Sequence, residues 1–196
     1  KVNLHDLSLE IPNLNYSKEK NTKADLDFYI DSSNSGYEIG RLLYSSEKNK
    51  IELDEVKLNK KLEIKDISNI KVFTFINKRK NNDFSISKYG TLKNTISING
   101  KVLDAEPLLK SLYKKKDGKK TLSKDFNSEI KVNIDKATTG TNDDVLNFSM
   151  IASIKEGSYD KLILKGNFSE NEIIEMSIYQ EDQNKKTLQV ISDRAR

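Results

Sequence analysis

The stretch FYIDSSNSGYEIGRLLYSS, from Phe28 to Ser46, decides the fold class because it is compatible with two structures. Its Ser-Asn-Ser-Gly run has the composition of a turn between two short strands. The β-favouring residues Phe28, Tyr29 and Ile30 support that turn, as do two glycines, each of which costs about 1 kcal/mol inside a helix. The apolar residues of the same stretch also fit one side of a long helix.

A helix over residues 23–47 is the interpretation that we favour. It places six residues at alternating spacings of four and three, which is one continuous stripe. These candidate interaction residues are Leu26, Ile30, Ser33, Tyr37, Gly40 and Tyr44. Because Ser33 and Gly40 are small, they would give a close neighbour room, and Gly40→Leu is expected to cost about 1–3 kcal/mol through overpacking.

The last third of the chain predicts a β-meander. From Glu129 onward, apolar residues alternate with polar ones in short runs that are separated by turn residues. These runs are EIKVNID, VLNFSMIASI, YDKLILKG, IIEMSIYQ and TLQVIS. Such alternation is typical of antiparallel strands with one wet face.

The middle of the chain adds further strands and one short helix. IKVFTFIN is apolar on both faces, so we expect an interior strand, while Asn99-Gly100 predicts a hairpin turn. Asp104 can cap a short helix that runs through Leu108 to Tyr113, with Pro107 in its first turn. The expected fold is therefore α+β: an N-terminal helix packed on an antiparallel β-sheet with a C-terminal meander.

The composition indicates a folded chain with a strongly solvated surface. Of 196 residues, 35% are hydrophobic and 33% are charged, and the formal net charge is +4. We expect a single domain over 1–196, in which 1–22 is an N-terminal extension and 62–192 is mainly β. No run approaches the roughly 20 apolar residues that cross a bilayer, so membrane contact is expected only through a segment upstream of Lys1.

Residues that could carry chemistry are scattered. The chain has no cysteine and one histidine, His5, which excludes disulfides, thiolate nucleophiles and imidazole clusters. The loop 135–144 has oxygen ligands that suit calcium, but it lacks the spacing of the helical calcium loop. Nucleotide and hydrolase fingerprints are absent. We expect no enzyme, no catalytic residue, no cofactor, no metal site and no small-molecule substrate.

A lysine-rich segment, residues 110–124, offers an alternative. Its lysines could neutralise phosphates, and Tyr113 could stack on a base. The lack of arginine disfavours base readout, because the guanidinium fork makes the bidentate contacts that bases require. Nucleic-acid binding is therefore a second alternative function.

Residues 21–50 also resemble the lower helix of minor pilins from type IV pili of Gram-positive bacteria. The matching positions are Tyr29, Ser35-Gly36, Glu38-Ile39 and Leu42-Leu43-Tyr44. The resemblance implies a helix laid against an antiparallel sheet, which would have to begin after Pro12 or be broken there. It also implies a cell-surface or extracellular location and other protein subunits as partners.

The first functional hypothesis is therefore a non-catalytic subunit of an extracellular filament or similar surface assembly. The alternative is the soluble ligand-binding module of a surface-anchored lipoprotein, with the ligand held on the sheet. If the stretch around Ser32 to Gly36 forms two strands, the pilin resemblance loses its structural support and the binding module becomes the better hypothesis.

Overall fold

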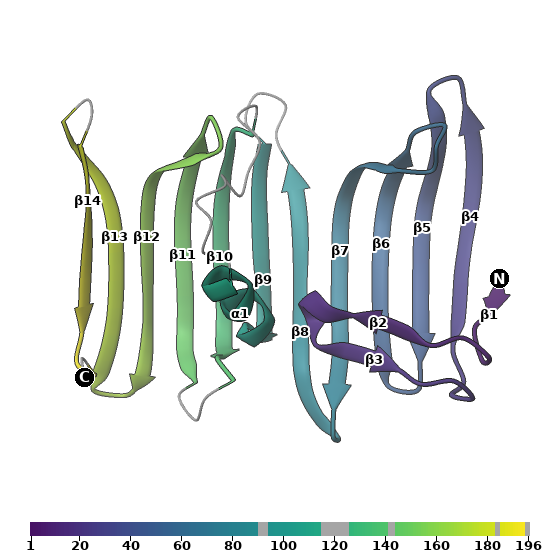
Figure 1. The fold of residues 1–196 in the computed structure, drawn as a ribbon, viewed down its shortest axis with the longest axis horizontal. Coiled ribbons are helices and arrows are strands. Elements are labelled where there is room, and N and C mark those ends of the chain that lie inside the picture. The colour runs from purple at the N-terminus through teal and green to yellow at the C-terminus, as the bar shows by residue number, and fades with distance from the viewer. Residues whose placement is uncertain (90–93, 115–125, 141–143, 183–184, 195–196) are drawn as a thin grey trace. The chain divides into compact units, whose positions relative to one another are not determined.

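The computed structural model describes residues 1–89, 94–114, 126–140, 144–182 and 185–194. These residues are nearly all β and divide into two compact units. We call Lys1–Lys88 the N-terminal unit and Tyr89–Arg196 the C-terminal unit. Each contains its own mainly antiparallel strands (Figure 1).

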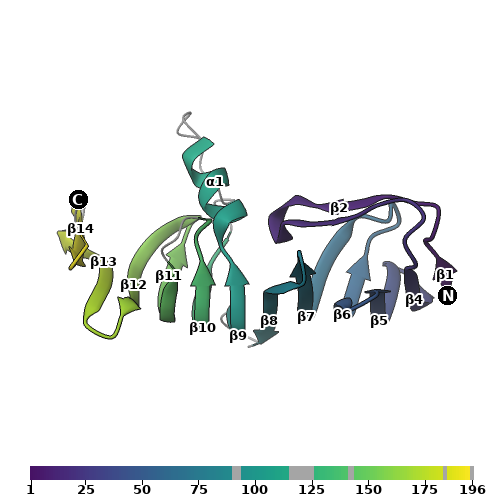
Figure 2. The same cartoon turned by 90° about the horizontal axis from the view of Figure 1, so that it is seen from below.

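The N-terminal unit contains a meander that one short hairpin covers. Its strands follow the order β1-β4-β5-β6-β7-β8, with antiparallel neighbours. They are β1 (Val2–Asn3), β4 (Asp25–Ser33), β5 (Gly36–Ser46), β6 (Asn49–Leu58), β7 (Ile64–Ile76) and β8 (Arg79–Tyr89). Strands β2 (Leu9–Ile11) and β3 (Tyr16–Lys18) flank a 3₁₀ turn, Pro12–Leu14, and lie over one face of the meander (Figure 2).

Two rows of apolar side chains form the covered face. Because side chains alternate along a strand, residues that pair across the sheet share a face. One row is Leu26, Tyr44, Ile51, Val72 and Phe84, and the other is Phe28, Leu42, Leu53, Ile70 and Ile86. Residues 1–22, which we call the N-terminal cover, pack on these rows through Leu9, Ile11, Leu14 and Tyr16.

A pair of tyrosines joins the cover to the sheet. The hydroxyl groups of Tyr16 and Tyr44 are 2.8 Å apart, and their rings meet edge to face with centroids 5.9 Å apart. Both side chains are buried, so each phenol satisfies the polar atom of the other. This contact gives the core of the N-terminal unit a specific geometry.

The C-terminal unit contains six strands in the order β9-β10-β11-β12-β13-β14. They are β9 (Asn94–Asp104), β10 (Ser128–Thr138), β11 (Val145–Lys155), β12 (Ser158–Ser169), β13 (Glu172–Asp182) and β14 (Lys185–Ser192). β9 and β10 are parallel and the other neighbours are antiparallel. The helix α1 (Glu106–Lys114) follows β9 and rises from the sheet beside β9 and β10 (Figure 2).

The predicted helix over residues 23–47 is wrong, and with it the α+β fold with an N-terminal helix. The segment is a hairpin of β4 and β5, in which Ser33 pairs with Gly36 across the turn Asn34-Ser35. A side chain at Gly36 would overlap with the carbonyl oxygen of Leu58. The helical spacing was misleading because intervals of three and four also arise by chance in two strands joined by a short turn. Leu26 and Tyr44, the first and last residues of the expected stripe, are in fact direct cross-strand partners.

Other local predictions have mixed outcomes. The C-terminal meander is confirmed as β10–β14, and β7 lies between β6 and β8 as an interior strand. The Asp104 cap is also confirmed, because the amide of Glu106 donates to Asp104 Oδ1 at 3.1 Å. The hairpin at Asn99-Gly100 is wrong: both residues continue β9 and pair in parallel with Asn133 and Ile134.

Candidate functional site

Two uninterrupted rows of apolar side chains cross all six strands of the C-terminal unit. Each row takes one residue from every strand, in register from β9 to β14. The first row is Ile98, Val132, Met150, Leu164, Met176 and Val190, and the second is Ile96, Ile130, Ala152, Leu162, Ile178 and Leu188. We call these twelve side chains the apolar rows.

Burial falls along the apolar rows towards β14. Val132, Ala152 and Leu162 are buried, whereas Leu188 and Val190 are 59% and 55% exposed. The structure thus leaves the β14 end of the rows open to solvent.

The opposite face of the same strands is mostly polar. One row on this face consists of Ser97, Lys131, Ile151, Ile163, Ser177 and Gln189, so polar residues flank two isoleucines at its centre. Lys165 on this face forms an ion pair with Glu175 at 2.9 Å. The C-terminal sheet is therefore amphipathic, and an exposed contiguous apolar surface of this kind marks a site of interaction.

The six candidate interaction residues do not form one stripe. Leu26, Ile30 and Ser33 lie on β4, and Tyr37, Gly40 and Tyr44 lie on β5. The sheet brings Leu26 and Tyr44 together as cross-strand partners on the covered face. Of the remainder, Tyr37 is half-buried and the other three are exposed.

Gly40 faces open space rather than a close neighbour. No atom lies within 4 Å of the position that a Cβ would occupy there. It borders an open hollow of about 480 Å³ that Asp27, Tyr29 and Arg41 also line. The expected overpacking by Gly40→Leu therefore has no basis in the structure.

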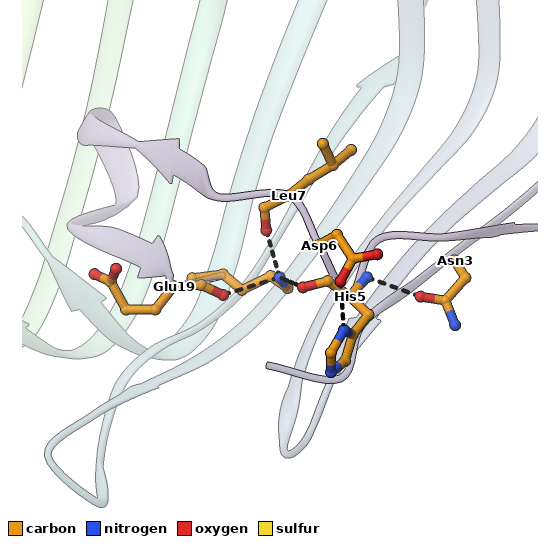
Figure 3. Close-up of polar contacts among 6 residues, drawn as sticks. Asn3, His5, Asp6, Leu7 and Glu19 are labelled. Carbon is orange, nitrogen blue, oxygen red and sulfur yellow. Dashed lines mark hydrogen bonds and ion pairs between the residues drawn. The ribbon is translucent and has the colours of Figure 1, made fainter. Parts of the chain in front are cut away.

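A buried lysine secures the N-terminal cover. The Lys18 side chain is 3% exposed, and its ammonium donates to the carbonyl oxygens of Leu7 at 2.5 Å, Glu19 at 3.0 Å and His5 at 3.4 Å. Figure 3 shows these oxygens converging from two parts of the cover. All three donor positions of the ammonium are used, which is how a buried charge is tolerated. We assign this arrangement a structural role.

The carboxylate of Glu52 on β6, which basic residues of β5, β6 and β7 surround, is also structural. Glu52 is nearly buried, and its carboxylate oxygens lie 2.8 Å from Arg41 Nε, 3.3 Å from Lys50 Nζ and 3.7 Å from Lys71 Nζ. The hydrogen bond from Arg41 lowers the pKa of Glu52 against the opposing effect of burial. Its charge is thus compensated on the sheet, so Glu52 has none of the features of a catalytic base.

The described residues contain no cluster of three or more acidic, histidine or cysteine side chains that could hold a metal. His5 Nδ1 lies 2.8 Å from the carboxylate of Asp6 in an exposed segment. The calcium hypothesis for 135–144 depends on residues 141–143, which lie outside the described part of the chain. Residues 115–124, which make up most of the lysine-rich segment 110–124, also lie outside the described part of the chain.

No helix in the described part of the chain is long and apolar enough to cross a membrane. No protein-family model, curated protein or solved structure matches this chain. Evidence for function therefore comes from the geometry of the sheet.

The apolar rows are the candidate surface that the sequence interpretation missed as a unit. Alternation along each of the last five strands was visible, but the register between strands was not. The two methionines of the chain, Met150 and Met176, were a sequence feature that pointed to this surface, because the structure places both in one row.

Proposed function

We propose that this protein is a non-catalytic binding module that holds an aliphatic chain on the apolar rows of its C-terminal unit. The observation that carries the proposal is the exposed end of two rows that contain apolar side chains at every strand. Burying such surface is favourable by about 25 cal/mol per Å².

The chemistry of the rows favours an aliphatic ligand. None of the twelve side chains carries a hydrogen-bond donor or an aromatic ring, and their only acceptors are the weak thioether sulfurs of the two methionines, so the surface offers mainly dispersion contacts. Met150 and Met176 are unbranched and adapt to the shape of a flexible chain. The row from Leu164 through Met176 to Val190 runs across the strands, which gives an extended molecule a continuous path.

The test is the binding of a fluorescent long-chain fatty acid, used as the probe, to the purified protein. The double variant Leu188→Asp/Val190→Asp puts two carboxylates on the open end and is expected to weaken binding at least tenfold. The matched control is Gln189→Asp/Ile191→Asp, because both residues are on the same strand, are exposed and face the polar side. It should bind like the wild type.

Two results would refute this function. One is a wild-type protein that does not bind the fatty acid, and the other is an equal loss in the control variant. Circular dichroism spectra of all variants show whether the sheet has remained folded.

A subunit of a surface assembly, outside the cell, is the second candidate. Its pilin-like helix is replaced by the β4–β5 hairpin, so this candidate rests on a different observation: strands β4 and β14 each have one side without a described partner strand over most of their length. Strand edges of this kind accept another protein by strand addition.

A further inference from the structure

The edge of β14 is unusually unprotected. Within the described residues β14 pairs with β13 alone, so its other side presents unpaired backbone groups. Natural edge strands are commonly blunted by charge, proline or a bulge along their length. Here lysines stand only at the start, where Lys185 forms an ion pair with Glu181 at 2.6 Å and Lys186 donates to the carbonyl oxygen of Tyr159 at 2.6 Å. Leu188, Val190 and Ile191 follow with 46–59% exposure.

The edge of β4 has the opposite charge. The short strand β1 pairs with Asp25 and Leu26 only, so no described strand pairs with the outer side from Asp27 to Ser33. This part carries the exposed carboxylates of Asp27 and Asp31. Between them lie Tyr29 and Ile30, which are 73% and 41% exposed.

The β14 edge carries lysines and the β4 edge carries aspartates, so charge favours pairing between the two edges. If β14 of one molecule lies antiparallel to β4 of another with Lys186 opposite Asp31, Lys185 comes opposite Ser32, Leu188 opposite Tyr29 and Val190 opposite Asp27. Pairing of β4 with a second β4 would instead bring aspartates together, which is unfavourable. The antiparallel arrangement also repeats the pairing of neighbouring strands around both edges.

We propose that β14 of one copy of this chain adds antiparallel to the free part of β4 in a second copy. The two contributing edges differ, so the contact is heterologous, and its repetition gives either a closed ring or an open filament. Copies can therefore add further copies head to tail. The contact is made by the backbone edge of β14, and it differs from the aliphatic site in this respect, although Leu188 and Val190 on that strand belong to both.

The experiment is sedimentation velocity over a roughly hundredfold range of protein concentration, where association follows mass action. The wild type is expected to exceed its monomer mass of 22.4 kDa at high concentration, and to do so less in high salt. Two charge-reversed variants are compared: Asp27→Lys/Asp31→Lys at the β4 edge and Lys185→Glu/Lys186→Glu at the β14 edge.

Each variant alone should remain monomeric, because its own two edges now carry like charges. An equal mixture should associate again, since the basic β4 of one variant meets the acidic β14 of the other. The control, Lys101→Glu/Lys161→Glu, changes two exposed lysines on β9 and β12 and should associate like the wild type.

Several results would overturn the proposal. A wild type that stays monomeric at every concentration excludes it. So does association that persists in the Asp27→Lys/Asp31→Lys variant, which would indicate pairing of β14 with itself, and so does a mixture that fails to associate. Fatty-acid binding by the monomeric variants would leave the proposed function standing even if this contact were refuted.

Discussion

The N-terminal and C-terminal units contain the same device with different surroundings. Each sheet has two apolar rows in register across its strands. In the N-terminal unit the cover of residues 1–22 packs on the rows, and Tyr44 is 4% exposed. In the C-terminal unit no described segment lies on the β14 end, and Leu188 is 59% exposed. A short covering segment thus buries the apolar face of the N-terminal sheet as a core. Where no described segment covers it, the apolar face of the C-terminal sheet stays exposed to solvent at β14.

The side chains of the two sets of rows also differ. The covered rows contain Phe28, Tyr44 and Phe84, whose rings have defined edge and face contacts. The apolar rows of the C-terminal unit hold Met150 and Met176 and no ring. Rigid aromatic residues suit a fixed partner within the chain, and flexible residues suit an exchangeable one.

The largest difference is expected on truncating one residue in each set of rows. Tyr44→Ala should lower the free energy of unfolding by about 3–5 kcal/mol, since it removes a buried ring and leaves Tyr16 without its hydroxyl partner. Leu188→Ala should change it by less than about 0.5 kcal/mol. Urea denaturation followed by circular dichroism measures both. Equal losses would contradict the contrast between covered and open rows.

The next effect concerns the attachment of the cover. Lys18→Met keeps the aliphatic stem but removes the ammonium from three carbonyl oxygens, which should cost about 1–3 kcal/mol. Hydrogen exchange should increase first in residues 1–22. Lys23→Met is the control, because Lys23 is exposed. Unchanged stability in Lys18→Met would show that the ammonium does not hold the cover.

A pair of glycines gives a smaller contrast. A methyl group at Gly166 on β12 would overlap with Val145 Cγ1, so Gly166→Ala should cost about 1–2 kcal/mol. At Gly40 the same change meets open space and should stay within about 0.5 kcal/mol. Thermal melting of the two variants compares them directly. A large loss in Gly40→Ala would mean that the hollow beside β4 and β5 is filled.

The smallest effect is electrostatic and depends on pH. Because the folded-state pKa of Glu52 is lowered, its charge stabilises the fold above its unfolded pKa of about 4.3, and this contribution is lost as the pH falls through the folded value. The difference in stability between wild type and Glu52→Gln should therefore shrink on acidification. Glu175→Gln, which disrupts an exposed pair with Lys165, should show a smaller difference at every pH. Parallel urea titrations at several pH values test this.

Much of the C-terminal unit could be predicted from the sequence because its strands alternate in a regular manner. EIKVNID and TLQVIS leave little choice between helix and strand, and Asp104 is a good cap for α1. The prediction of a helix over residues 23–47 was wrong because apolar spacings of three and four also occur by chance in two strands separated by a short turn, here β4 and β5. The prediction of a hairpin turn at Asn99-Gly100 was wrong because this dipeptide is also compatible with a continuous strand when the neighbouring strand comes from far along the chain.

The candidate site was harder to predict than the strands. Its composition was visible as isolated apolar residues, such as Met176 and Val190. Their union into rows depends on register, which cross-strand packing decides and a linear pattern does not. Exposure at β14 was equally hidden, because it depends on what covers a face and not on the residues of the face itself.

The parallel pairing of β9 with β10 has a consequence for the order of folding. Ser128 reaches the carbonyl oxygen of Asn94, a partner 34 residues away, whereas hairpins such as β4–β5 join neighbours through tight turns. Closing a long loop costs entropy before any contact compensates for it. The N-terminal meander can therefore grow hairpin by hairpin from the first turns of the chain. The β10–β14 meander can likewise assemble by itself, and we expect docking of β9 to follow as the slower step that completes the C-terminal sheet.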